Sequence, residues 1–183
     1  MKYNNRYVLH KRIFAERGRA RVLQANRSAH MAEINESKFI EKELTLRKLR
    51  LSREVLETRR SMVRWLALSL GIINPGESRI QALYVLDGIF NFQFKKKQDP
   101  SVQELSEYIN TNWGHINEKT LRYHLLRLKN AGILGNLKGK YFMMVPENGE
   151  KYDEAAWVDF YFDSEVSPIK DKLKTVLKEF KKR

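Results

Sequence analysis

The sequence of 183 residues contains no cysteine and only four prolines. The lack of cysteine excludes disulfide bonds and thiolate metal sites. No apolar run approaches the roughly 20 residues of a membrane-spanning helix. The most apolar stretch, residues 62–73, is short and contains Arg64. The N-terminus lacks the apolar stretch and cleavage site of a secretion signal, so we expect a cytoplasmic protein.

Sequence signals of catalysis are also missing. There is no glycine-rich phosphate loop ending in Lys-Ser/Thr, no HExxH and no nucleophile elbow. The histidines form no pair at metal-ligand spacing, and the carboxylates of residues 147–165 spread around their predicted helix. We therefore expect a protein that is not an enzyme, with no metal, cofactor or small-molecule ligand.

Positive charge is concentrated in two places along the chain. Residues 1–70 hold 17 Lys and Arg against 7 Asp and Glu, a net charge of +10, whereas residues 71–183 carry only +3. Within the second part, residues 115–141 contain six Lys and Arg but a single carboxylate, Glu118. Two basic segments of this kind predict a polyanionic partner.

The second basic segment contains a well-delimited helix. Asn117 can accept hydrogen bonds from the first turn as an N-cap, and Gly132 can end the helix in the left-handed conformation. At 100° per residue, Leu121, Leu125 and Leu128 share one narrow stripe that can dock on a core. The opposite side of this helix, residues 118–131, is cationic and aromatic.

A basic hairpin is predicted directly after this helix. The turn-rich residues 135–140 separate the apolar pair at 133–134 from the strand-like residues 141–145. A cationic helix followed by such a hairpin suits a DNA major groove and its backbone. The candidate DNA-binding residues are Ser101, Lys119, Thr120, Arg122, Tyr123, Arg127, Lys138 and Lys140.

This order of elements resembles the helix-turn-helix and wing of the winged-helix superfamily. Residues 119–134 in particular are similar to the recognition helix and wing entry of small prokaryotic regulators of the MarR and ArsR kind. The resemblance covers roughly residues 75–160. It implies a DNA-binding fold, without naming an operator or an effector.

Two further helices are predicted before the cationic helix. Asn74 and Pro75 can begin a helix that runs to about Phe94. Ser101 and Glu104 form a capping box that opens a short helix ending near Asn110. In this position Ser101 could also bind a phosphate at the helix N-terminus.

Residues 37–70 lack glycine and proline and predict one long helix. Its apolar residues recur every eleven positions, which would give one long seam. This seam could pack on the chain's own domain or pair two copies, and its candidate oligomerisation residues are Ile40, Leu44, Leu51, Val55, Met62 and Leu66. For residues 1–36, the sequence fits both a stable helix and a flexible arm that becomes ordered on its partner.

The C-terminal part predicts two more helices. The first covers residues 152–162, and Ser167-Pro168 would begin the second with the N-cap and proline order. The second has an apolar stripe that could pack or pair protomers. Its members are Ile169, Leu173, Val176, Leu177 and Phe180.

We therefore expect a mainly α-helical fold with a small β-hairpin wing. It would comprise a basic arm and long helix (1–73), a winged helix-turn-helix domain (74–146) and C-terminal helices (147–183). The leading interpretation is a dimeric, nucleoid-associated transcriptional regulator that binds double-stranded DNA. One alternative is an architectural protein that coats nucleic acid non-specifically. The other is a winged-helix adaptor between proteins of a replication or transcription complex.

Overall fold

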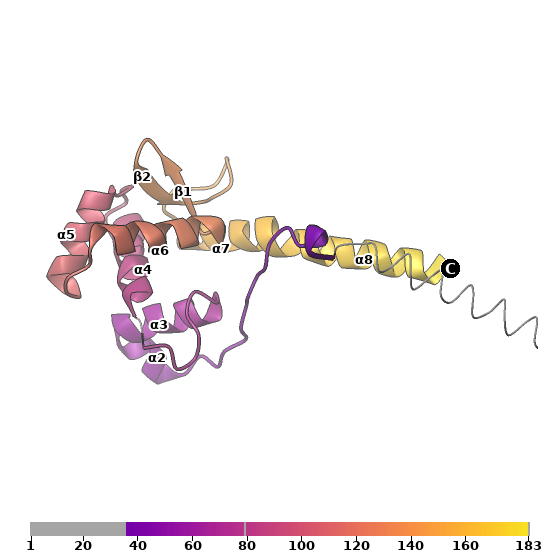
Figure 1. The fold of residues 1–183 in the computed structure, drawn as a ribbon, viewed down its shortest axis with the longest axis horizontal. Coiled ribbons are helices and arrows are strands. Elements are labelled where there is room, and N and C mark those ends of the chain that lie inside the picture. The colour runs from indigo at the N-terminus through magenta and orange to yellow at the C-terminus, as the bar shows by residue number, and fades with distance from the viewer. Residues whose placement is uncertain (1–35, 79, 183) are drawn as a thin grey trace, which may run out of the picture. The chain divides into compact units, whose positions relative to one another are not determined.

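The computed structural model describes residues 36–78 and 80–182. These residues are mainly helical with one antiparallel hairpin, which confirms the predicted fold class. The chain divides into two compact units, Met1–Glu43 and Leu44–Arg183. The elements, shown in Figure 1, are η1 (Glu36–Phe39), α2 (Arg53–Glu57), α3 (Arg59–Ser69), α4 (Gln81–Phe90), η2 (Asn91–Lys95), α5 (Val102–Asn112), α6 (Glu118–Asn130), β1 (Leu134–Leu137), β2 (Lys140–Met143), α7 (Glu154–Tyr161), η3 (Phe162–Val166) and α8 (Ser167–Lys182). No described helix is long and apolar enough to cross a membrane.

The predicted long helix over residues 37–70 is wrong. The chain is extended or irregular between η1 and α2, and a break at Thr58 separates α2 from α3. Thr58 has an extended backbone, and its side chain accepts a hydrogen bond from the Ser61 N–H as the N-cap of α3. The eleven-residue seam therefore does not exist as one stripe, and Ile40 and Leu51 are separately exposed. Most of the predicted arm, residues 1–35, lies outside the described residues.

Arg47 explains why the segment before α2 is extended. Its guanidinium donates to the carbonyls of Leu68 at 2.8 Å and Ile73 at 3.0 Å, around the C-terminal end of α3. Its backbone N–H donates to the Ser69 carbonyl at 2.9 Å. A cation that binds the free carbonyls at a helix end is favourable. These bonds hold the segment beside α3, where a continuous helix could not place it.

The helix predicted to begin at Pro75 begins at Gln81 instead. The Glu77 carboxylate does accept from the Asn74 N–H at 2.9 Å, as a capping box requires. The Glu77 N–H, however, bonds the Asn74 carbonyl at 3.1 Å and closes only a turn. The capping hydrogen bond is therefore present, but it closes a turn in the loop before α4 and does not begin a helix.

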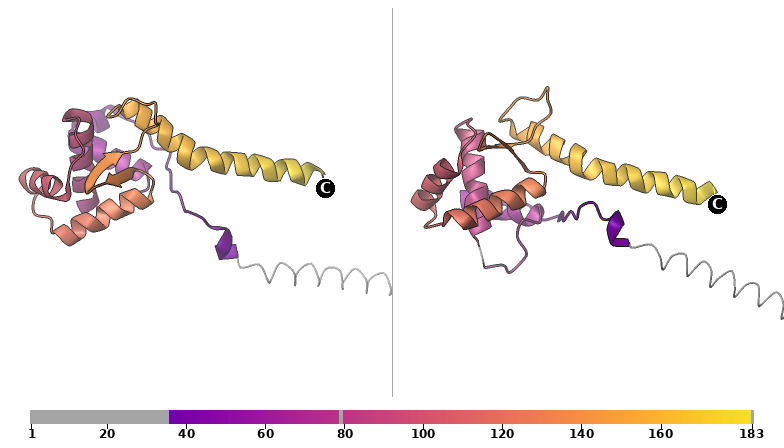
Figure 2. Two further views of the ribbon diagram at one scale, coloured as in Figure 1. Left: turned by 90° about the horizontal axis from the view of Figure 1, so that it is seen from above. Right: turned by 45° about the horizontal axis from the view of Figure 1, so that its top comes forward.

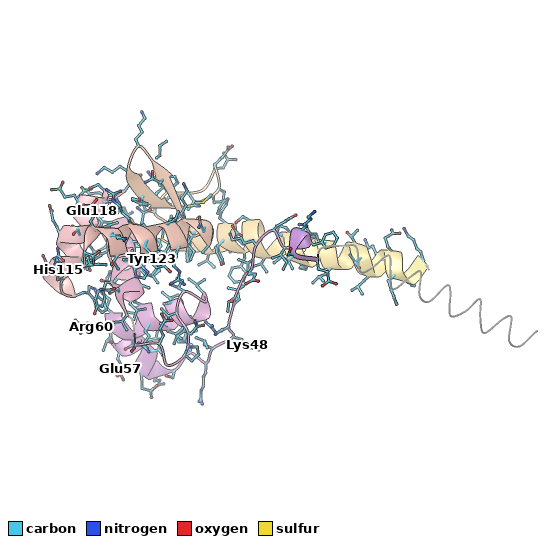
Figure 3. All side chains as sticks on the ribbon, viewed as in Figure 1. Lys48, Glu57, Arg60, His115, Glu118 and Tyr123 are labelled. Atoms are coloured by element: carbon cyan, nitrogen blue, oxygen red, sulfur yellow. The ribbon has the colours of Figure 1, made fainter. Side chains whose placement is uncertain are left out.

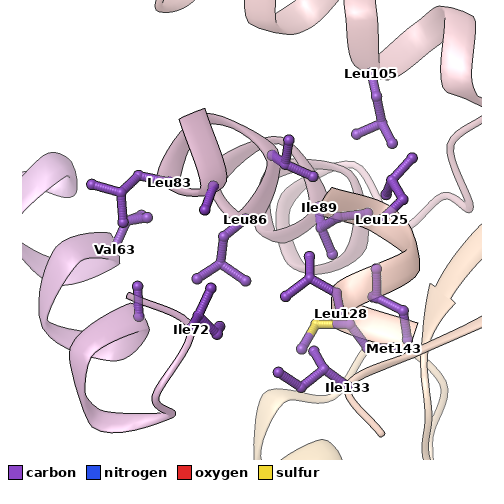
Figure 4. Close-up of a cluster of buried hydrophobic side chains, with 14 of the residues drawn as sticks. Val63, Ile72, Leu83, Leu86, Ile89, Leu105, Leu125, Leu128, Ile133 and Met143 are labelled. Atoms are coloured by element: carbon purple, nitrogen blue, oxygen red, sulfur yellow. The ribbon is translucent and has the colours of Figure 1, made fainter. Parts of the chain in front are cut away.

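The core of the Leu44–Arg183 unit is assembled around α4, whose Leu86 and Ile89 are fully buried. Leu105 from α5 and Leu125 from α6 pack against it, and Figure 4 shows Val63 of α3 in the same cluster. The helix preceding the predicted domain boundary at residue 73 thus contributes to the same core. A helix with one apolar stripe gains most of its stability from this kind of docking.

The two helices of the predicted helix-turn-helix form as expected. Ser101 and Glu104 make both bonds of the capping box at the start of α5. The Asn117 side chain accepts from the Thr120 N–H at 2.8 Å and caps α6. Gly132, with a φ of 79°, ends α6 in the left-handed region. The predicted positions of α5 and α6 are confirmed.

The predicted hairpin is also confirmed, with a tighter turn than expected. Leu137 pairs with Lys140, so only Lys138 and Gly139 form the loop, and both have positive φ. This is the pattern of a type I′ turn. Gly135 therefore belongs to β1, where a Cβ would collide with the Phe142 ring. The hairpin is tied to the body because Tyr141 N–H donates to the Pro100 carbonyl at 2.9 Å.

The predicted N-cap at Ser167 is wrong, because α7, η3 and α8 form one uninterrupted helical segment (Figure 2). Pro168 has no N–H and its ring would clash with a carbonyl one turn earlier in a regular α-helix. The turn before it, η3, is a π-helix. Such a widened turn accommodates a proline without ending the helix.

Candidate nucleic-acid interface

Helix α6 presents two chemically different sides. Leu121, Leu125 and Leu128 are at most 2% exposed, which confirms the docking stripe predicted from the sequence. Tyr123 and Leu126 on the other side are 56% and 55% exposed. The helix is therefore fixed by its apolar stripe, while the opposite side faces solvent. Figure 3 labels Tyr123 on this helix.

The predicted contact residues on α6 are all at or near the surface. Lys119, Arg122, Tyr123 and Arg127 are exposed, and Thr120 is partly exposed. Lys119 makes no ion pair or hydrogen bond with another residue of the described ranges. It therefore has all three ammonium donors available to an acceptor outside the chain.

Arg127 and Tyr123 form a small stacked unit on this side. The Arg127 guanidinium lies 5.8 Å from the centroid of the Tyr123 ring. One of its nitrogens also donates to the Ile72 carbonyl at 3.2 Å, which ties α6 to the loop after α3. A guanidinium has five donors, so this bond leaves Arg127 able to contact a further acceptor.

Arg122 forms an exposed ion pair that contributes little to stability. Its Nε donates to the Glu118 carboxylate at 2.7 Å, one helical turn earlier, and both side chains are more than half exposed. Exposed pairs at this spacing stabilise a helix by only about 0.3–0.5 kcal/mol. A phosphate group could replace Glu118 at little cost.

The structure places Ser101 and Lys140 in one network, and this network leaves little room for the predicted phosphate at Ser101. The Glu104 carboxylate accepts from the Ser101 N–H, from its hydroxyl and from the Lys140 ammonium, each at 2.7 Å. The hydrogen bond from Lys140, followed by those from Ser101, lowers the pKa of Glu104 to about 2. The chain's own carboxylate thus occupies the N-terminus of α5, and Lys140 points back to it.

This network should make stability depend on pH. A carboxylate with a lowered pKa stabilises the fold above its unfolded value, here about 4.5, and loses this contribution as pH falls towards 2. Because the Glu104 side chain is 41% exposed, the contribution is at most about 1 kcal/mol. Urea unfolding of the wild type and Glu104→Gln should differ at pH 5 and converge at pH 2. A constant difference across this range would contradict the assignment.

Lys138 is the cation at the tip of the hairpin. It is exposed and makes no ion pair within the described part of the chain. It also has a φ of 50°, which an L-residue adopts at some cost. Of the two lysines predicted to contact DNA from the wing, Lys138 is therefore the one free to do so.

Asp87 was not predicted to be important, yet it joins the helices that carry the interface. Its buried carboxylate accepts from the Tyr108 hydroxyl and the Trp113 indole N–H, both at 2.8 Å, and from Arg59 Nε. Burial, followed by the bond to Asp87, raises the pKa of Tyr108 to about 12. Asp87 thereby connects α3, α4, α5 and the turn before α6. Its partners lie 21 to 28 residues away, so no local sequence signal could reveal them.

Arg60 adds a cation that the sequence also did not indicate. Its guanidinium lies 4.6 Å from the centroid of the Trp113 ring, beside the turn that leads into α6. This position is 57 residues before Asn117 in the sequence but next to the same turn in the fold. The basic region around the start of α6 is therefore larger than the segment 115–141 alone.

Two of the four histidines, His115 and His124, lie within the described residues. His124 is half-buried, and burial lowers its pKa, with the charge of Arg127 adding to the effect. His115 is exposed in the turn before α6 (Figure 3). Among the described residues, no three His, Asp or Glu side chains gather at a distance suited to a metal ion.

No protein-family model, curated protein or solved structure matches this chain.

Proposed function

We propose that this chain binds double-stranded DNA, with α6 in the major groove and the hairpin tip on the neighbouring backbone. The observation that carries the proposal is the exposed side of α6, where Lys119, Tyr123 and Arg127 project from a helix anchored by three buried leucines. Donors and an aromatic ring on a rigid helix suit base edges and phosphates. Lys138 extends the same cationic surface from the hairpin.

In this mechanism the residues divide into two groups. Lys119, Arg122 and Lys138 neutralise phosphates and fix the orientation of the helix, a contribution that is independent of sequence. Tyr123 and Arg127, which lie on the centre and one flank of the exposed side, contact base edges. A dimer of such a domain would read two half-sites, as expected of a transcriptional regulator.

Substitutions in the two groups should therefore have different effects. Tyr123→Ala should weaken binding to a selected site by about 1–3 kcal/mol and binding to random duplex much less. Lys138→Asn should weaken binding to both alike and reduce the slope of log K against log salt by about one. Asparagine suits the left-handed turn position, so this variant removes the charge without opening the hairpin. The measurement is fluorescence anisotropy over a salt series.

The matched control is Lys97→Asn. Lys97 is also an exposed lysine with positive φ, 53°, but it lies in the loop before α5. If Lys97→Asn and Lys138→Asn lowered the salt slope equally, the charge of the whole domain and not the hairpin tip would be responsible. Equal losses on selected and random duplex from Tyr123→Ala would contradict base readout.

A second function, coating nucleic acid with little sequence preference, is favoured by the net charge of +10 in residues 1–70. This charge exceeds what a compact reader of one site requires. The two functions differ in their products on DNA. A discrete retarded band on a short palindrome supports the regulator, and a ladder that grows with DNA length supports the coat.

A further inference from the structure

One side of α8 carries a continuous row of exposed apolar side chains, which we call the C-terminal seam. Four members are spaced by four, three and four residues, and the fifth, Leu177, lies beside them. Their exposed fractions range from 45% to 80%. The members are Ile169, Leu173, Val176, Leu177 and Phe180.

Nothing in the described chain covers this seam. No residue of α8 is buried, although the helix continues from η3 and from α7, and α7 contacts the core through Trp157 and Tyr161 (Figure 2). Large apolar side chains are seldom left in water in such a row, and an exposed contiguous patch usually marks an interaction surface.

The spacing of the seam indicates which surface covers it. Apolar residues at alternating intervals of three and four recur every 3.5 residues, which keeps a narrow row facing one partner helix. The spacing of these four members therefore favours another helix as the partner.

We propose that two copies of this chain associate through α8, with the C-terminal seam of one against the same seam of the other. Asp171 bonds Lys174 at 3.3 Å and Glu179 bonds Lys182 at 2.5 Å, so both carboxylates of this helix are paired within it. Two-fold symmetric pairing is the commonest assembly of identical chains.

This inference deepens the proposed function, because it names the surface that joins two DNA-binding domains, but the association itself does not require DNA. Residues 167–182 contain six lysines against Asp171 and Glu179, so two α8 helices repel each other electrostatically. Added salt screens this repulsion and should tighten the association. Salt has the opposite effect on binding to DNA or to anionic lipid.

The test is sedimentation equilibrium of the full chain across a concentration series at low and high salt, without DNA. The wild type should approach twice the single-chain mass of 21.7 kDa, at lower protein concentration when salt is high. The double variant Leu173→Gln/Val176→Gln should stay at the single-chain mass. Both positions are at least 60% exposed, so the substitutions should leave the fold intact, as circular dichroism would verify. Thr175→Gln, on the polar side of the same helix, should behave like the wild type.

The absence of cysteine provides a second readout. Leu173→Cys oxidised alone should give disulfide-linked dimers if the two helices run parallel, and Ile169→Cys mixed with Phe180→Cys should do so if they run antiparallel. Thr175→Cys should give none in either case. A wild type that remains single at all concentrations overturns the proposal, as does a dimer that survives the glutamine substitutions. So does a single chain that binds vesicles containing phosphatidylserine through the seam. DNA binding by the glutamine variant, measured on a half-site, shows separately whether the proposed function holds.

Discussion

Replacing Asp87 with alanine is expected to lower the free energy of unfolding by about 2–4 kcal/mol. The variant leaves the Tyr108 hydroxyl and the Trp113 indole N–H without their acceptor, and it removes the partner of Arg59. A buried donor that loses its acceptor costs about 1–3 kcal/mol, because it had given up water to make the bond. Urea unfolding at neutral pH measures the change.

Asp159→Ala is the matched control for this experiment. It makes the same change of charge and size at an exposed position of α7, and should alter stability by less than about 0.5 kcal/mol. A cycle with Tyr108→Phe then tests whether the two residues act together. Once Asp87 is absent, the loss of the Tyr108 hydroxyl should not lower the free energy of unfolding further. If the two losses of stability were additive, the bond between Tyr108 and Asp87 would not contribute as proposed.

The contrast between Asp87 and Ser101 shows what the sequence could reveal about this fold. The bonds that cap α5 and α6 join residues three apart, so a single local pattern contains both donor and acceptor. The position of the helix-turn-helix could therefore be predicted. Asp87 is recognised only by residues on other helices, and its role appears only when these helices are packed.

The helix predicted over residues 37–70 failed for a related reason. Composition and the eleven-residue period describe the side chains, and both favour a helix. They do not contain the hydrogen bonds of Arg47 to carbonyls 21 and 26 residues away, and these tertiary contacts overruled the helical preference. The cap at Thr58, by contrast, is a local pattern that the prediction missed.

The residues of the candidate site could be predicted from the sequence, but which of them are paired with other side chains could not. All five positions proposed on α6 lie on or beside its exposed side, and the hairpin follows where expected. The sequence could not show that Lys140 is held by Glu104, or that Lys138 alone remains free at the tip. Such pairing depends on the approach of the hairpin to α5, which no local pattern specifies.

Two adjacent leucines of α6 allow anchoring and contact to be separated. Leu125 is fully buried and Leu126 is 55% exposed, so the same substitution by alanine meets opposite environments one residue apart. Leu125→Ala should lower the free energy of unfolding by about 2–5 kcal/mol, because it removes apolar contacts and leaves a cavity beneath the helix. Leu126→Ala should change it by less than about 0.5 kcal/mol.

The same pair distinguishes a surface that meets DNA from one that is merely exposed. If α6 enters a groove, Leu126→Ala should weaken DNA binding several-fold at unchanged stability, because its side chain then packs against the duplex. Leu125→Ala should be studied at a temperature where the variant remains folded. Because Leu125 is buried, this variant can weaken DNA binding only indirectly, by letting α6 move on the core. Binding unaffected by Leu126→Ala would place the duplex elsewhere, since Leu126 is exposed one helical turn after Tyr123 on the same side of the helix.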